Sequence, residues 1–389
     1  MKKVQKPREH ILTLSCPDRR GIVRAVSGLL ADNGCNILDS AQFYDVASGV
    51  FYMRVHFVDE TGGGRELPAK FTTLGEQFAM DWHLRDAGYK PRVLLMVSKT
   101  GHCLNDLLFR YSSGLIHADI AAVVSNHEDF RALTESHGIP FHYLPVSAET
   151  RATQEQQLLQ LIADERIDLI VLARYMQVLS PELCHALRGR AINIHHSFLP
   201  SFKGAHPYAQ AHARGVKLIG ATAHFVTDAL DEGPIIEQDV IRVGHAMSAK
   251  EFTAMGRDVE SVVLARAVNW FVQHHILLNG DKTIIFRWAR RRADGDPHRC
   301  IAQPRDHRIA ARAFARHGLA FPAREHPRPR SRRAAQAGHH ALERLGGFRI
   351  DGLRRTQATR PAAWRDQVDA HGFGAFAQGR RGETAAAHP

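Results

Sequence analysis

Two short stretches of the chain combine side chains that are typical of acyl-transfer chemistry. The first reads AINIHHSFLP over residues 191–200 and places Asn193 two positions before His195. Successive side chains of a strand point to opposite faces, so these two share one face and the isoleucines beside them anchor the other. An amide donor next to an imidazole suits stabilisation of an oxyanion and movement of a proton. The same residues also fit a turn-capping asparagine and a hydrogen-bonded core histidine.

The second stretch supplies carboxylates. It reads HFVTDALDEGP over residues 224–234 and places Asp228 and Asp231 in a loop that Gly-Pro closes. A carboxylate near a histidine can hold the ring as the imidazolium or accept a proton from water. Together the two stretches indicate an acyl-transfer site at the end of a strand.

Neither the cysteines nor the neighbouring histidines form a convincing set of metal ligands. The five cysteines are scattered along the chain, and no C-x-x-C pair occurs. Alternation along a strand places His195 and His196 on opposite faces, so they cannot readily share one ion. We therefore predict a site that contains no metal.

Hydrophobic patterning predicts the elements that position this chemistry within a domain spanning residues 91–286. Strands are expected at 92–97, 119–124, 141–144, 167–172 and 191–195, and helices at 103–111, 127–137 and 154–165. A long helix at 248–275 and a short strand at 283–286 follow. Such alternation predicts an α/β fold with a doubly wound, mainly parallel sheet, whose ligands bind beyond the carboxyl ends of the strands.

A smaller ferredoxin-like βαββαβ unit is predicted over residues 9–87. Its strands are expected at 11–15, 36–44, 50–58 and 80–84, with one helix from Ile22 to the Asn33-Gly34 pair and another at 66–78. Glycine after the last helical turn is a typical helix end. The segment 86–91 then serves as the linker to the larger domain.

The positive charge of the chain is confined to its last hundred residues. The whole chain carries a net charge of +11, yet residues 287–389 alone hold 22 arginines, no lysine and 9 acidic residues. Residues 1–286 are therefore slightly acidic, and the charge does not indicate a nucleic-acid-binding body. The segment 287–389 is rich in Arg and Ala and has no sustained period, which predicts a disordered tail. We expect no specific nucleic-acid partner.

The sequence also indicates where the protein is found. No run approaches the roughly 18 apolar residues that a membrane span requires. The apolar stretch near the N-terminus is too short for a signal-peptide core and lacks a small-residue cleavage site. We therefore expect a cytoplasmic protein with no membrane partner.

The two polar stretches, taken together, resemble a known domain. The pattern NIHxSxLP, followed some thirty residues later by HFVTxxLDxGP, resembles the folate-dependent formyltransferase domain over residues 91–286. That family includes enzymes that formylate glycinamide ribonucleotide or methionyl-tRNA and enzymes that hydrolyse 10-formyltetrahydrofolate. The resemblance implies catalytic roles for Asn193, His195 and Asp231, and a supporting role for His224.

The resemblance also implies where folate binds. The segment VLARYMQVL at 171–179 is similar to the folate-binding loop of the family, whose backbone meets the pterin edge. The residues implied in substrate binding are Met176, Gln177, Val178, Leu179, Thr227, Asp228 and His102. The segment 171–179 also fits an ordinary strand end that leads into a helix beginning at Ser180-Pro181.

The N-terminal unit resembles an ACT domain, a regulatory module that often binds amino acids where two such domains pair. The strongest motif is DRRGIV at 18–23 followed by Asn36-Ile37. The resemblance implies an amino-acid effector and a homo-oligomer. A ferredoxin-like domain that serves only packing is the alternative.

The acceptor of the formyl group is the remaining choice. Residues 98–108, SKTGHCLNDLL, depart from the glycine- and serine-rich phosphate loop of a ribonucleotide enzyme, although Lys99 could still contact phosphate. These residues, the AHPY segment at 205–208 and the ACT-like domain resemble the deformylases of the family. The resemblance implies hydrolysis of 10-formyltetrahydrofolate to formate and tetrahydrofolate. The formate would feed purine synthesis, and the reaction would need no cofactor. Formyl transfer to an amine and a non-catalytic folate-binding regulator are the alternatives.

Overall fold

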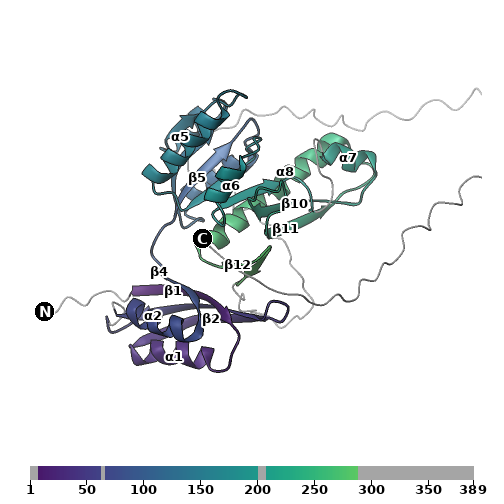
Figure 1. The fold of residues 1–389 in the computed structure, drawn as a ribbon. Coiled ribbons are helices and arrows are strands. Elements are labelled where there is room, and N and C mark those ends of the chain that lie inside the picture. The colour runs from purple at the N-terminus through teal and green to yellow at the C-terminus, as the bar shows by residue number, and fades with distance from the viewer. Residues whose placement is uncertain (1–7, 63–65, 200–206, 288–389) are drawn as a thin grey trace, which may run out of the picture. The chain divides into compact units, whose positions relative to one another are not determined.

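The computed structural model describes residues 8–62, 66–199 and 207–287 (Figure 1). The tail predicted at 287–389 lies outside these residues except for Arg287. Residues 205 and 206 of the AHPY segment lie outside them as well. Among the described helices, none is long and apolar enough to cross a membrane.

The N-terminal unit contains one antiparallel sheet. Its elements are β1 (Arg8–Pro17), α1 (Ile22–Asp32), β2 (Cys35–Asp45), β3 (Val50–Asp59), α2 (Leu67–Phe78) and β4 (Asp81–Asp86). The strand order is β2-β3-β1-β4, and both helices lie on one face of the sheet (Figure 1). That face buries alternate residues, such as Leu12 and Leu14 on β1, because strand side chains alternate. The predicted βαββαβ unit is confirmed.

The larger unit is built on a sheet of seven strands in the order β11-β10-β9-β8-β5-β6-β7. Its strands are β5 (Arg92–Val97), β6 (Asp119–Ser125), β7 (Phe141–Tyr143), β8 (Leu169–Leu172), β9 (Ala191–His195), β10 (Leu218–Phe225) and β11 (Ile235–Arg242). The strands from β9 to β7 are parallel, whereas β10 runs antiparallel to both of its neighbours, β9 and β11. The predicted doubly wound, mainly parallel sheet is confirmed, and β10 and β11 are additions that the sequence did not predict.

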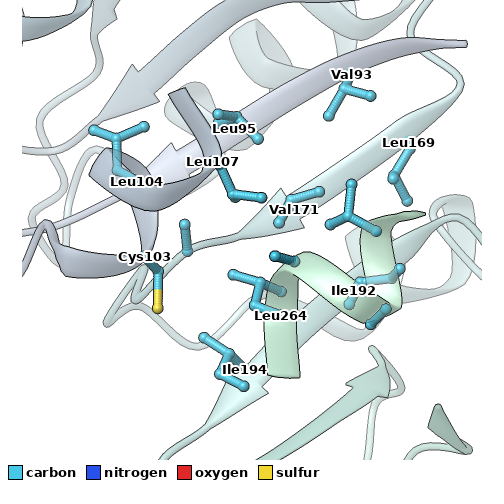
Figure 2. Packing of buried hydrophobic residues seen from close by; sticks show 14 of the residues in the cluster. Val93, Leu95, Cys103, Leu104, Leu107, Leu169, Val171, Ile192, Ile194 and Leu264 are labelled. Carbon is cyan, nitrogen blue, oxygen red and sulfur yellow. The ribbon is translucent and has the colours of Figure 1, made fainter. Parts of the chain in front are cut away.

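Helices of this unit form apolar layers against the sheet. They are α3 (His102–Ser112), α4 (Arg131–Ser136), α5 (Arg151–Asp164), α6 (Pro181–Ala186), α7 (Pro207–Ala213) and α8 (Ala249–Val272). Figure 2 shows side chains of β5, β8 and β9 packed against Leu104 and Leu107 of α3 and Leu264 of α8. This layer includes Ile192 and Ile194, so the apolar face of β9 is anchored as predicted.

The predicted and observed elements differ by up to four residues at their ends, and the start of α4 shows the largest difference. Helix α4 begins at Arg131 rather than at residue 127. The backbone amide of His127 donates to the Ser125 hydroxyl, so residues 125–127 form a turn before the helix. The strand predicted at 283–286 is part of a hairpin formed by β12 (Ile276–Asn279) and β13 (Lys282–Ile285).

The strand order reverses between β5 and β8, which makes this the switch point of the sheet. The loops that follow these two strands meet there, since the backbone amide of Ser98 donates to the carbonyl of Arg174 at 3.2 Å. In open α/β sheets, ligands bind beyond the strand ends at such a point.

Candidate active site

A cavity of about 620 Å³ lies at this switch point. The catalytic residues predicted from the sequence all line it, and so do the predicted substrate-binding residues: Asn193, His195, Asp231, Met176, Gln177, Val178, Leu179, Thr227, Asp228 and His102. The cavity therefore brings together predicted residues from four separate stretches of the chain.

Asn193 and His195 reach the cavity from the C-terminal end of β9. Strand β9 pairs with β10, which sets Asn193 opposite His224. The Nδ1 atom of His195 lies 3.1 Å from Oδ2 of Asp231. The other ring nitrogen, Nε2, is buried and has no hydrogen-bond partner among the described residues. The imidazole is thus held at one nitrogen and left available at the other.

Asp231 is placed by a tight loop between β10 and β11. Its backbone has φ +59°, in the left-handed region that aspartate tolerates better than most residues. Two residues later, a Cβ on Gly233 would lie 1.8 Å from the carbonyl oxygen of Phe225, so only glycine fits. The Phe225 amide donates to Pro234, which folds the loop back onto the end of β10.

The protonation of Asp231 follows from its surroundings. Burial favours the neutral acid, but the hydrogen bonds and charges of His195 and His224 outweigh burial and hold the pKa of Asp231 well below its ordinary value. Asp231 is therefore a carboxylate at neutral pH and accepts the Nδ1 proton of His195.

His224 orients the amide of Asn193. The His224 Nδ1 atom lies 2.9 Å from the carbonyl oxygen of Phe225, which can only accept, so Nδ1 carries a proton. Nε2 lies 3.2 Å from Asn193 Nδ2 and 3.6 Å from Asp231 Oδ1. In the neutral ring Nε2 accepts from the Asn193 amide, and in the charged ring it pairs with Asp231. One amide N–H of Asn193 is used in this way, and the second remains available to a substrate oxygen.

One side of the cavity is apolar and exposed. The side chains of Met176, Val178 and Leu230 are 57%, 56% and 63% exposed, which is unusual for large apolar residues around a cavity. The Ser98 hydroxyl accepts from the Met176 amide at 2.9 Å and donates to Asn126 at 2.7 Å, so this segment is held in place. Ser180 caps α6, so the segment is also a strand end that leads into a helix, as the alternative interpretation expected.

The cavity is also lined by a buried charged network, in which His102 was predicted from the sequence but Glu260, Arg174 and Tyr208 were not. Glu260 of α8 is 1% exposed. Its carboxylate lies 2.9 Å from His102 Nε2, accepts from the Tyr208 hydroxyl at 2.7 Å and lies 3.4 Å from Arg174 Nε. Burial raises the pKa of Glu260, but these three partners outweigh it and the pKa is lowered. A glutamate among apolar positions of α8, next to Val259, is the sequence signal that marks this site.

Among the described residues, one group of side chains has the composition and spacing of a metal site. It consists of His102, Cys103 and Glu260, whose ligand atoms lie within 4.8 Å of one another. Burial raises the pKa of the Cys103 thiol, which opposes the thiolate that a metal requires. The guanidinium of Arg174 already neutralises Glu260, and His102 is hydrogen-bonded to the same carboxylate. These contacts suit a hydrogen-bonded network better than a cation.

His196 does not lie where strand alternation places it. Strand β9 ends at His195, and the rings of His195 and His196 stack with centroids 5.0 Å apart and planes at 29°. Both line the cavity. The prediction that they lie on opposite faces is wrong, because the chain enters a turn at His196 and the alternation of a strand no longer applies.

The fold and the site together define an ACT-domain protein with a formyl transferase domain. The family model for formyl transferase matches residues 91–268, and the model for the ACT domain matches residues 10–69. A formyltetrahydrofolate deformylase from Corynebacterium sp. (strain P-1) is 47% identical over 280 residues, 72% of this chain and 98% of the relative. The relative from Bacillus subtilis (strain 168) is 48% identical and covers 71% of this chain and 93% of its own length.

A solved structure agrees with these relatives. The formyltetrahydrofolate deformylase of Burkholderia mallei ATCC 23344 has a TM-score of 0.70 and 52% identity, covering 72% of this chain and 100% of that chain. The chain belongs to the formyltetrahydrofolate deformylase family, and the resemblance drawn from its motifs is confirmed.

Proposed function

We propose that this chain hydrolyses 10-formyltetrahydrofolate to formate and tetrahydrofolate. The observation that carries the proposal is the state of His195, whose Nδ1 is held by Asp231 while Nε2 is buried and available at the cavity. An imidazole in this state is a general base, because the carboxylate stabilises the imidazolium that forms when Nε2 takes a proton. Membership of the deformylase family supports the same activity.

In the proposed mechanism, water adds to the formyl carbon. Nε2 of His195 takes one proton of the water as the C–O bond forms, and the carbonyl oxygen becomes an oxyanion. The free amide N–H of Asn193 and the protonated His195 stabilise this oxyanion. The bond from carbon to N10 then breaks, and N10 takes the proton from His195 and leaves as the amine of tetrahydrofolate. Asp231 remains a carboxylate throughout.

Binding of the folate fits the exposed apolar side of the cavity. The pterin edge would meet backbone groups of Met176 to Leu179, with the side chains of Val178 and Leu230 against its faces. Thr227 and Asp228 line the same side from the loop that carries Asp231. The proposal requires no metal and no organic cofactor, since the chemistry uses only a base, a carboxylate and an amide donor.

The decisive assay uses the purified full chain with 10-formyltetrahydrofolate, with and without glycinamide ribonucleotide. Formate release at the same rate in both reactions is the expected result. A reaction that requires the added amine would contradict hydrolysis and favour formyl transfer. Binding of the folate without any turnover would favour the non-catalytic regulator.

The same proposal extends to regulation and assembly. We expect a cytoplasmic homo-oligomer whose ACT domains pair and bind an amino acid, and the buried free thiols of the described residues fit a reducing compartment. Light scattering of the purified chain tests the oligomer. A screen of amino acids for a change in activity or unfolding temperature tests the effector, and no effect from any of them would contradict it.

A further inference from the structure

His196 presents a second imidazole at the reacting centre, and its tautomer is fixed. Arg174 lies with a terminal guanidinium nitrogen 2.6 Å from Nδ1 of His196. Every nitrogen of a guanidinium is a donor, so Nδ1 must be the acceptor and carry no proton. The neutral ring then carries its only N–H at Nε2.

The guanidinium that imposes this tautomer is paired with a buried carboxylate. Arg174 adopts φ +67°, a left-handed conformation that is costly for a long side chain and persists only where the surroundings enforce it. Its Nε lies 3.4 Å from the carboxylate of Glu260. Glu260 is in turn hydrogen-bonded to Tyr208 and paired with His102. The buried charged network of the cavity thus ends at His196.

The surroundings also keep His196 neutral. Burial and the positive charge of Arg174 lower the pKa of His196 to about 4. A proton on Nδ1 would in addition face a guanidinium N–H at hydrogen-bond distance. At neutral pH, His196 is therefore an N–H donor that does not exchange its proton with the reaction.

We propose that the Nε2–H group of His196 binds the oxygen of the attacking water, and that Arg174 and Glu260 are positioning residues that act through it. This inference rests on the proposed function. Within the described residues, Nε2 of His196 has no hydrogen-bond partner, and its ring stacks on that of His195. The two stacked rings offer complementary groups, because Nε2 of His195 accepts a proton of the water while Nε2–H of His196 donates to its oxygen.

The assignment explains why the polar network is buried beside a reaction that uses no charged acceptor. The water must reach the formyl carbon beside the base His195, and the ring of His196 stacks on that of His195. A rigid donor there holds a water molecule in line without taking part in proton transfer. Such positioning lowers the barrier of the chemical step, so it contributes to kcat rather than to KM.

Two substitutions at His196 distinguish this role from a stacking role. His196→Gln keeps an N–H donor near the position of Nε2 but loses the ring, whereas His196→Phe keeps a stacked ring but loses the donor. We expect Phe to lower kcat about 100-fold, as for loss of one donor at a reacting oxygen, with KM within a few-fold, and Gln to retain most of kcat. The reverse order, with Phe active and Gln inactive, would overturn the proposal.

The positioning residues have a matched test. Arg174→Lys keeps a donor and a charge beside Glu260, so it should retain more kcat than Arg174→Met, with little difference in KM. Arg266→Lys is the control, because Arg266 also pairs with a carboxylate, Asp239 at 2.8 Å, but outside the cavity. Equal kcat for both Arg174 variants would remove Arg174 from the proposal.

A measurement that is independent of activity separates this inference from the proposed function. Nitrogen-15 NMR of the full chain labelled at histidine reports which ring nitrogen carries the proton, and the His196→Gln variant identifies the signal of His196. The expected result at pH 7.5 is the neutral Nε2–H tautomer. A charged ring or the Nδ1–H tautomer would overturn the inference even if the wild-type chain releases formate. Absence of formate release with the expected tautomer would instead contradict the proposed function and the water-binding role that rests on it.

Discussion

Nδ1 of His195 and Oδ2 of Asp231 lie 3.1 Å apart, and this contact joins the end of β9 to the loop after β10. It depends on two backbone features of that loop, the left-handed conformation of Asp231 and the absence of a side chain at Gly233. The general base of the proposed reaction is therefore assembled by the antiparallel pairing of β9 with β10 and not by either sequence stretch alone.

Replacing Asp231 by asparagine should lower kcat by about 10²- to 10⁴-fold, because an amide cannot stabilise the imidazolium of His195 as a carboxylate does. KM should change much less, since Asp231 acts on the reaction through the ring of His195. The measurement is formate release under saturating 10-formyltetrahydrofolate. Asp164→Asn, at the exposed end of α5, is the control and should leave kcat unchanged. A kcat within tenfold of wild type would contradict the role of Asp231.

Replacing Ser98 by alanine should affect binding more than chemistry. The hydroxyl bridges Asn126 and the Met176 amide, and its loss leaves both groups without this partner at a cost of about 1–3 kcal/mol. We expect KM to rise about tenfold while kcat stays within a few-fold, because the folate-binding segment shifts but His195 does not. Ser112→Ala, on the exposed side of α3, serves as the comparison. An unchanged KM would exclude this positioning role.

Local pattern predicted most of the fold. Strands β5 and β9 have the bounds expected from the sequence, because each is a short apolar run flanked by turn residues. Strand β10 was missed because its residues from Ile219 to Phe225 are all buried, so the polar–apolar alternation that identifies a half-exposed strand is absent.

The candidate site was predictable only where its residues lie within one motif. Asn193 and His195 are two positions apart, and Asp231 follows in the second motif. Glu260 and Arg174 come from separate elements, and only the packing of α8 against the sheet brings them together. The spacing of residues along one element cannot predict such a contact between elements. His196 was misplaced for a related reason, since strand alternation does not predict side-chain direction once the strand has ended.

Two glycine substitutions in helices should have opposite effects on stability. Gly256 lies within α8, where alanine normally stabilises a helix by about 1 kcal/mol. A Cβ at Gly256 would lie 2.1 Å from the ring of Tyr208, so Gly256→Ala must displace that ring from its contact with α8. We expect a lower unfolding midpoint and lower kcat, because the hydrogen bond from Tyr208 to Glu260 is disturbed.

The matched control is Gly28→Ala in α1, where the added methyl group meets no atom within 4 Å. It should raise the unfolding midpoint and leave activity unchanged. If Gly256→Ala stabilised the protein as well, Tyr208 would have to be free to move away from α8 at little cost.

Stability should fall as the pH is lowered from about 6.5 towards 4, and buried histidines are the cause. Burial, followed by neighbouring arginines, lowers the pKa of His196 to about 4, of His274 to about 3 and of His275 to about 4. The unfolded chain takes up protons at these residues near pH 6.5, whereas the folded chain does not. The unfolded state thus binds more protons below pH 6.5. The contribution of these histidines to the free energy of unfolding is therefore fully present above pH 6.5 and decreases as the pH falls.

Each of these histidines contributes up to about 1.4 kcal/mol per pH unit within this window. Asp231 acts at lower pH, because its pKa is lowered from 3.8 and its contribution is lost only below that value. Urea denaturation at pH 7.5, 6.0 and 5.0, at constant ionic strength, measures the slope. His274→Asn should flatten it, since asparagine tolerates the φ of +56° at this position and does not titrate. The exposed His245→Asn should leave the slope unchanged, and equal slopes for His274→Asn and wild type would refute the assignment to His274.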